Sequence, residues 1–179
     1  WAMDTVRALA YGDNVVDFLV EGFASLSANA LLVLKLASCV GSRFDLSVLY
    51  AISPADADVP SALWSLMEKW LVMPIGGGFR LMDTDRLSLL ESSIPVEFAF
   101  QHDRIRQAAY GLVAEEEKES LHLKVGMALL ASARPGALSA ERLFAVTNHL
   151  NMARSLVGRG PGLEELPVRR RQEDRSRGP

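Results

Sequence analysis

The sequence is poor in cysteine and histidine, and it lacks a long uninterrupted apolar run. Its single cysteine, Cys39, cannot form a disulfide within the chain, which fits a reducing compartment. The most apolar stretch, residues 30–40, is interrupted by Lys35 and is about half the ~20 residues that a membrane-spanning helix needs. No basic leader precedes an apolar run near the N-terminus, so no signal peptide is indicated. We therefore expect a cytoplasmic chain without membrane contact. Because the sequence begins with Trp1, we expect its natural start to lie upstream.

A surplus of basic charge is also missing. The formal net charge of the 179 residues is -3, whereas a dedicated nucleic-acid binder usually carries a basic face. Hydrophobic residues make up 49% and charged residues 23%, which are values typical of a folded globular chain. The charge therefore argues against nucleic acid as the partner, and the composition supports a sizeable core.

No motif in the sequence supplies a complete active site. Gly76-Gly77-Gly78 lacks the Gly-Lys-Ser/Thr ending of a phosphate-binding loop and fits a hairpin turn better. His102-Asp103-Arg104 differs in order from a kinase catalytic loop. The three histidines are scattered, so we expect no metal site and no catalytic residue, and this chain alone is not expected to be an enzyme. Cys39 lies in the most apolar segment and is expected to be a structural thiol.

The periodicity of apolar residues predicts a mainly α fold. Short helices are expected at 3–10 and 14–24, and Ser27 and Asp58 are candidate N-caps for later ones. The central unit should contain three helices, a strand, a glycine turn, a strand that pairs back and a further strand, at residues 28–40, 46–52, 61–71, 72–75, 76–78, 79–82 and 96–100. Three helices followed by a small hairpin is the order of a winged-helix unit.

After this unit the sequence is helical again. Helices are predicted at 102–113, at 115–132 and from a cap at Ser139 to about Val157. The last one should place Leu143, Val146, Leu150 and Ala153 on its buried face. Glutamates 115–117 and 119 at a helix start complement the helix dipole. His122 and His149 are expected at helix surfaces or interfaces.

The chain is thus divided into four parts. Residues 1–26 form N-terminal helices, 27–101 a winged-helix-like domain, and 102–157 a helical extension that leads towards repeats. Residues 158–179 hold few large apolar groups and many charges, and are predicted to be disordered.

A winged-helix unit often binds DNA, so a DNA-binding transcriptional regulator is the alternative reading. The recognition helix would be 61–71, which carries Trp64 and Trp70 but only one base, Lys69. Readers of the major groove need basic and amide side chains. An apolar helix with two tryptophans is more typical of a packing surface.

Several blocks, in order, resemble one protein family. The segment 100–110 reads Phe-Gln-His-Asp-Arg-Ile-Arg-Gln-Ala-Ala-Tyr, and it resembles the Phe-x-His-Asp-Arg-x-x-Gln-Ala-Ala-Tyr signature of large bacterial signalling kinases. Segments 13–17, 34–46, 121–126 and 148–151 also resemble blocks of that family. Its members join a serine/threonine kinase-like domain, an AAA-type (STAND) ATPase, helical repeats, a GAF sensor and often the histidine kinase of a two-component system.

The resemblance implies a placement after the nucleotide-binding core of such a parent. The partners would be the adjacent nucleotide-binding and helical-repeat domains of the same protein, and the role would be to transmit nucleotide state to kinase output. The chain itself would hold no cofactor, while the parent would use ATP and ADP. By the same resemblance, His102 would contact the phosphate of ADP; the alternative is that His102 and Asp103 cap and dock the following helix. The family continues differently beyond Leu166, so we expect a truncated or frame-shifted tail.

Overall fold

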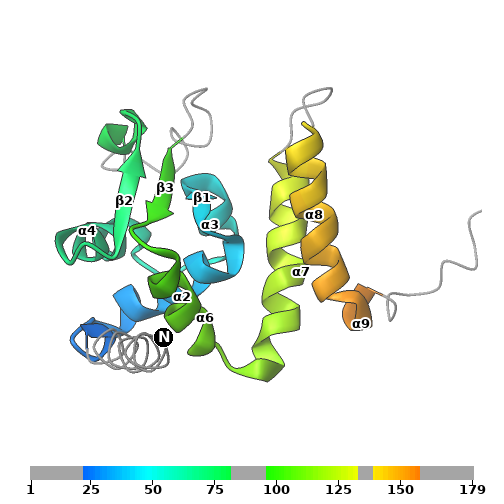
Figure 1. Ribbon diagram of the computed structural model, residues 1–179, viewed down its shortest axis with the longest axis horizontal. Coiled ribbons are helices and arrows are strands. Elements are labelled where there is room, and N and C mark those ends of the chain that lie inside the picture. The colour runs from blue at the N-terminus through cyan, green and yellow to red at the C-terminus, as the bar shows by residue number, and fades with distance from the viewer. Residues whose placement is uncertain (1–21, 82–95, 133–138, 158–179) are drawn as a thin grey trace, which may run out of the picture.

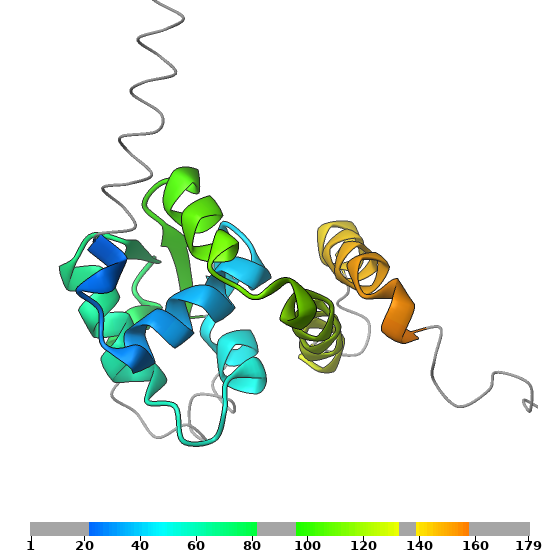
Figure 2. The same cartoon turned by 90° about the horizontal axis from the view of Figure 1, so that it is seen from below.

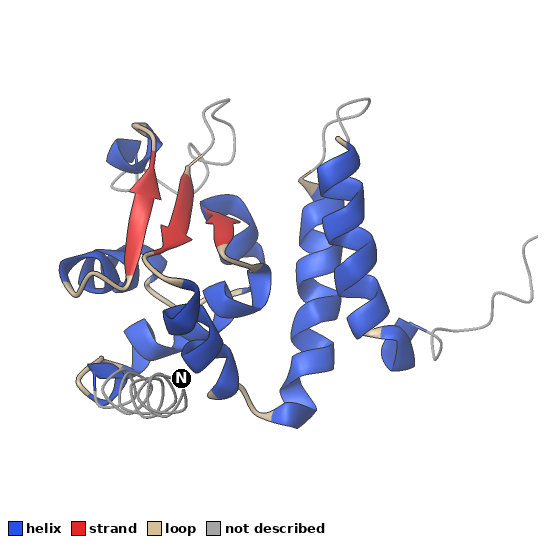
Figure 3. Cartoon of the chain, viewed as in Figure 1, coloured by secondary structure: helices blue, strands red, loops and turns tan. Residues whose placement is uncertain are grey.

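The computed structural model describes residues 22–81, 96–132 and 139–157 (Figure 1). These residues form helices and one small antiparallel sheet, which confirms the mainly α fold class (Figure 3). Three predictions lie outside the described residues: the helix at 3–10, most of the helix at 14–24 and the disordered tail.

Helix α2 (Ala28–Val40) is the centre of the sheet-bearing unit. The Ser27 hydroxyl accepts a hydrogen bond from Ala30 N, which confirms Ser27 as the N-cap. The helix ends before Gly41, also as predicted. Val33, Leu34 and Ala37 are fully buried, and α4 and α6 both pack against this helix.

Two short helices complete the three-helix set. The chain passes through β1 (Arg43–Asp45) into α3 (Leu46–Ile52), whose bounds match the prediction, and then into α4 (Val59–Glu68). Asp45 caps α3 by accepting from Ser47 N, and Asp58 caps α4 by accepting from Ser61 N. Strand β1 was not predicted, because three residues are too few to show a period.

Helix α4 ends earlier than the predicted 61–71. Trp70 has φ 57°, a left-handed conformation that is incompatible with a continuing helix and costs a non-glycine residue about 1–2 kcal/mol. The Trp70 side chain is 75% exposed, whereas Leu71 after it is buried. The turn at Trp70 therefore directs Leu71 into the core and leaves the indole in solvent.

The sheet has the order β1-β3-β2, where β2 is Val72–Ile75 and β3 is Glu97–Phe100. Phe44 of β1 lies opposite Phe98 of β3, and Pro74 of β2 lies opposite the same residue on the other side. The prediction that 79–82 pairs back on β2 is wrong: Gly78–Leu81 is a 3-10 helix, η1, and the partner of β2 is β3. The chain between the two paired strands is therefore longer than one tight hairpin turn.

Three helices and a terminal turn follow the sheet. Helix α6 (Asp103–Gly111) packs on α2, and the longer α7 (Glu115–Ala131) packs on α2 and α3. Helix α8 (Ala140–Met152) packs along α7, so α7 and α8 form a hairpin beside the sheet-bearing unit (Figure 2). The predicted single helix to Val157 breaks at Ala153, after which α9 (Arg154–Val157) turns back against α7.

The core lies between α2, α3, α4 and the inner face of the sheet. The Phe44 ring packs against the rings of Phe98 and Phe100, with centroids 5.8 Å and 5.7 Å apart. Among the residues that the structure describes, no helix is long and apolar enough to cross a membrane.

Candidate functional site

The predicted site residue, His102, lies at the junction of β3 and α6. Phe100 anchors the end of the strand in the core, and Gln101 N donates to Leu71 O at 3.1 Å. His102 then has extended backbone angles at the N-cap position of α6, and its side chain is exposed. The imidazole makes no capping hydrogen bond, so His102 does not cap α6 in the way that the alternative reading expected.

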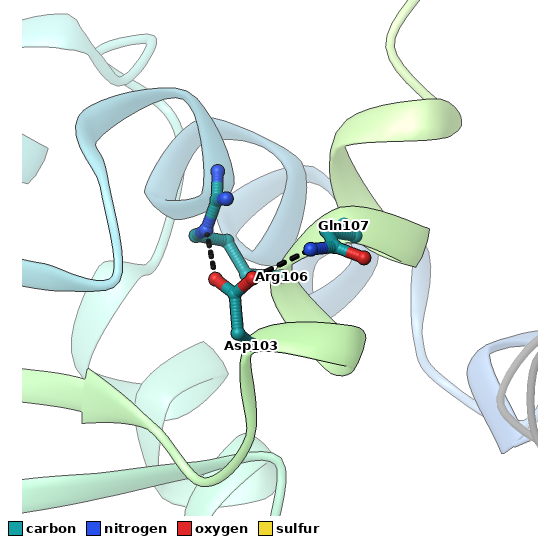
Figure 4. Close-up of polar contacts among 3 residues, drawn as sticks. All are labelled: Asp103, Arg106 and Gln107. Carbon is teal, nitrogen blue, oxygen red and sulfur yellow. Dashed lines mark hydrogen bonds and ion pairs between the residues drawn. The ribbon is translucent and has the colours of Figure 1, made fainter.

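Asp103 has a local role in the first turn of α6 (Figure 4). Its carboxylate accepts from Arg106 Nε at 2.8 Å and from Gln107 Nε2 at 2.6 Å. The hydrogen bond from Arg106 is the main reason that the pKa of this carboxyl lies below its usual range. A negative charge at a helix N-terminus is also favourable. Asp103 therefore stabilises the first turn of α6, and it forms these bonds with residues other than His102.

Gln101, next to His102, carries an unused acceptor. Its Oε1 atom is buried and has no hydrogen-bond partner among the described residues. A buried carbonyl oxygen without a donor costs about 1–3 kcal/mol. The β3–α6 junction thus combines an exposed imidazole with a buried, unsatisfied oxygen on consecutive residues.

A second polar cluster lies at the other end of α6, and sequence reasoning missed it. The Tyr110 hydroxyl is 2.9 Å from His122 Nε2, and His122 Nδ1 is 2.9 Å from His149 Nδ1. His149 Nε2 is 3.2 Å from the carbonyl oxygen of Val40 at the end of α2. The four groups come from α6, α7, α8 and α2, and we call them the imidazole bridge.

Of the two places expected for His122 and His149, a helix surface or an interface, the structure shows the interface, because they are only 4% and 6% exposed. They meet inside the α7–α8 interface. The sequence held a signal for this: His122 shares the inward stripe of α7 with Val125, and His149 shares that of α8 with Val146 and Ala153. Leu143, predicted on the same face of α8, is instead 47% exposed.

Burial changes the acid–base behaviour of the cluster. Desolvation is the main cause that lowers the pKa of His122 from 6.5 to about 4, with His149 and Lys118 adding repulsion. Desolvation also lowers the pKa of His149. Cys39, at the end of α2, has its pKa raised to about 11 by burial, which supports the expected structural thiol.

The Tyr110 end of the bridge faces an open depression of about 640 Å³ between α6, α7 and α9. Lys118 lies over the Tyr110 ring at 4.8 Å and pairs with Glu115 at 2.5 Å. Across the depression, Ser155 of α9 donates to the carboxylate of Glu119. Solvent therefore reaches the Tyr110 end of the bridge, where His122 also lines the depression, while His149 lies in the interior.

Fold and side chains together define a small α-rich domain whose polar clusters join helices to one another. In sequence it is similar to part of the hybrid signal transduction histidine kinase G of Dictyostelium discoideum, with 26% identity over 150 residues. The alignment covers 72% of this chain but only 4% of that relative, which is a eukaryotic and not a bacterial protein. No family model matches the chain, and no solved structure matches it.

Proposed function

We propose that this chain is a coupling segment of a larger signalling kinase, in which it transmits the nucleotide state of a neighbouring ATPase domain to kinase output. The observation that carries the proposal is the similarity to a signal transduction histidine kinase, of which the chain matches only 4%. A segment this small, inside a protein that long, acts through the domains beside it. The parent would bind ATP and ADP, and this chain would perform no chemistry alone.

An exposed apolar face on the sheet-bearing unit supports a role in domain contact. Trp64 on α4 is 40% exposed, Trp70 is 75% exposed, and Met73 on β2 is 42% exposed. Aromatic side chains and methionine are enriched in protein interfaces. The left-handed Trp70 adds to this argument, because such backbone strain tends to persist at functional positions. We assign this face to the neighbouring nucleotide-binding domain.

A second apolar face lies on the outer side of the α7–α8 hairpin. Phe144 is 76% exposed and Leu143 is 47% exposed, on the side of α8 that faces away from α7. The next helices of the same polypeptide would cover them. Two separate faces, one on each part of the domain, are what a segment between two neighbours requires.

His102 is the proposed sensor. Its exposed imidazole can donate a hydrogen bond to a phosphate oxygen. A contact that is present with one nucleotide and absent with another biases a two-state arrangement of domains.

The test uses the complete parent protein loaded with a fluorescent ADP analogue. We expect His102→Ala to release ADP about tenfold faster, since one hydrogen bond to a charged group contributes about 1.5–3 kcal/mol. His102→Gln, which retains a donor, should recover part of the retention. Lys124→Ala, an exposed change on α7, is the matched control. Equal ADP off-rates in wild type and His102→Ala would refute the sensor role.

DNA binding stays the second candidate, because the order of helices and strands is that expected of a winged helix. The only base near the end of α4, Lys69, donates instead to the Ser25 hydroxyl at 3.2 Å. Salt-sensitive binding of a DNA duplex in a gel-shift assay would favour the regulator over the coupling segment.

A further inference from the structure

The imidazole bridge connects the two parts of the domain. Tyr110 and the Val40 carbonyl belong to the sheet-bearing unit, through α6 and α2, whereas His122 and His149 belong to the α7–α8 hairpin. Lys118 of α7 also lies over the Tyr110 ring of α6, and Val125 of α7 packs against the apolar core. The bridge is thus the hydrogen-bonded part of an interface that also contains apolar contacts.

The direction of every hydrogen in the bridge follows from its buried end. A carbonyl oxygen can only accept, so His149 must donate to Val40 from Nε2–H. A neutral imidazole has one N–H, and His149 Nδ1 therefore accepts from His122 Nδ1–H. By the same rule His122 Nε2 accepts from the Tyr110 hydroxyl. All three bonds donate towards α2, and both rings are neutral.

An added proton can be hydrogen-bonded only if the direction of the bonds reverses. With the proton on His149, Nδ1–H would donate to His122 Nδ1, and His122 would become the Nε2–H tautomer and donate to the Tyr110 oxygen. With the proton on His122, Nε2–H would likewise donate to the Tyr110 oxygen, and that hydroxyl would turn towards the depression. In either case a positive charge is buried between α7 and α8, which is costly in the interior.

The surrounding groups do not compensate for such a charge. The ammonium of Lys118 on α7 repels a proton on His122, and its partner Glu115 lies at the exposed rim. The other titratable residues of the adjoining helices are Glu116, Glu117, Glu119 and Lys124 on α7, Asp103, Arg104 and Arg106 on α6, Lys35 and Cys39 on α2, Tyr50 on α3, Glu141 and Arg142 on α8 and Arg154 on α9. In the described part of the chain, neither ring is hydrogen-bonded to a carboxylate.

We propose that the imidazole bridge is a proton-operated latch: it holds the α7–α8 hairpin against α2 at neutral pH, and protonation of either histidine releases the hairpin. The proton comes from solvent through the open depression beside Tyr110, and no other reactant is required. Release moves α8 and its exposed Phe144 relative to the sheet-bearing unit. This inference concerns residues of this chain alone and holds whether or not the parent couples an ATPase.

The chain carries its own reporter for release. Cys39 is the only cysteine, it is 3% exposed, and the charge of Lys118 on α7 acts on it. Departure of the hairpin uncovers α2 near Cys39. Its reaction with 4,4′-dithiodipyridine, which remains reactive at acid pH, is measured on the full chain at pH 7.5 and pH 5.0. Each rate is normalised to the urea-unfolded chain at the same pH.

The wild type should react at least roughly tenfold faster at pH 5.0, because a histidine with a pKa of about 4 when closed and 6.5 when open favours the open state over that range. The double variant His122→Gln/His149→Gln can neither gain a proton nor show this increase. Lys124→Gln, which changes an exposed residue on α7, is the matched control and should behave as wild type. An unchanged wild-type rate, or a double variant that keeps the wild-type increase, would overturn the latch.

A second measurement covers the case in which the double variant is loosened at every pH. In wild-type chain with ¹⁵N-labelled histidine, NMR at pH 7.5 should show His122 as the Nδ1–H tautomer and His149 as the Nε2–H tautomer. Their protonation should coincide with shifts of the α7 and α8 amides. The opposite tautomers, or protonation without any amide shift, would contradict the proposal.

Discussion

The sheet-bearing unit and the α7–α8 hairpin are stabilised in different ways. The unit buries rings and aliphatic side chains, among them Phe98, Leu34 and Leu63, each fully buried. Of the three buried polar residues in the described ranges, Ser38 lies in the unit and bonds its own helix, while His122 and His149 lie in the hairpin. Apolar burial does not depend on proton concentration, whereas a buried imidazole does. The packing of the sheet-bearing unit is therefore independent of pH in this range, whereas the attachment of the hairpin depends on pH.

The contrast between the two parts would fail if the sheet-bearing unit did not contain the core on which the stability of the fold depends. Phe98 on the central strand is 0% exposed and packs against Phe44. Phe98→Ala should lower the free energy of unfolding by about 3–5 kcal/mol, the usual cost of such a cavity. Urea unfolding followed by circular dichroism measures this change, and Leu32→Ala, at a 36% exposed position of α2, is the control. A loss below about 1 kcal/mol would place the core elsewhere.

The packing of α8 against α7 should be sensitive to a substitution of Gly126. A Cβ atom built on Gly126 of α7 lies 3.0 Å from Leu150 Cδ2 and 3.5 Å from His149 Cβ. Gly126→Ala therefore requires the Leu150 side chain on α8 to shift by a few tenths of an ångström, next to His149. We expect a loss of about 1 kcal/mol, in which overpacking outweighs the helix propensity of alanine.

A double-mutant cycle with Leu150→Ala sharpens this prediction. Removing the Leu150 side chain makes room for the new methyl group, so Gly126→Ala should then cost nothing or stabilise. Denaturant titration of the four proteins gives the coupling energy. Additive effects of the two substitutions would show that the helices are not in close contact at Gly126.

Most of the fold could be predicted from the sequence, because N-caps and a clear apolar period identify a helix from local sequence alone. Ser27, Asp58 and Ser139 all act as the predicted N-caps. Two kinds of feature could not be predicted. Strand β1 exists only through its pairing with β3, and α4 ends where the core requires Leu71 to turn inwards at Trp70. Both are set by tertiary contacts rather than by local propensity.

Only part of the candidate site could be predicted from the sequence. The sequence pointed to His102, and the structure leaves its side chain exposed and uncommitted. It did not point to the pairing of His122 with His149, which are 27 positions apart and meet only because α7 and α8 are antiparallel neighbours. A buried histidine on the apolar face of a helix needs a hydrogen-bond partner, and here the facing helix supplies it as a second histidine.

The pH dependence of the hairpin has a definite sign. The pKa of His122 is lowered to about 4 in the folded state, and that of His149 is lowered as well, so the open state binds the proton more tightly. Stability is therefore complete above pH ~6.5 and falls as the pH drops towards 4. Asp103, whose pKa is also lowered, loses its contribution only below its usual value of 3.8, outside this range.

Native-state hydrogen exchange, followed amide by amide at pH 7.5 and pH 5.5 and corrected for intrinsic rates, tests this contrast most directly. We predict that protection falls severalfold at the lower pH for the amides of α7 and α8. The amides of α2, α3 and β3 should keep theirs. An equal loss in both parts, or no loss in the hairpin, would contradict a fixed unit joined to its hairpin through neutral imidazoles.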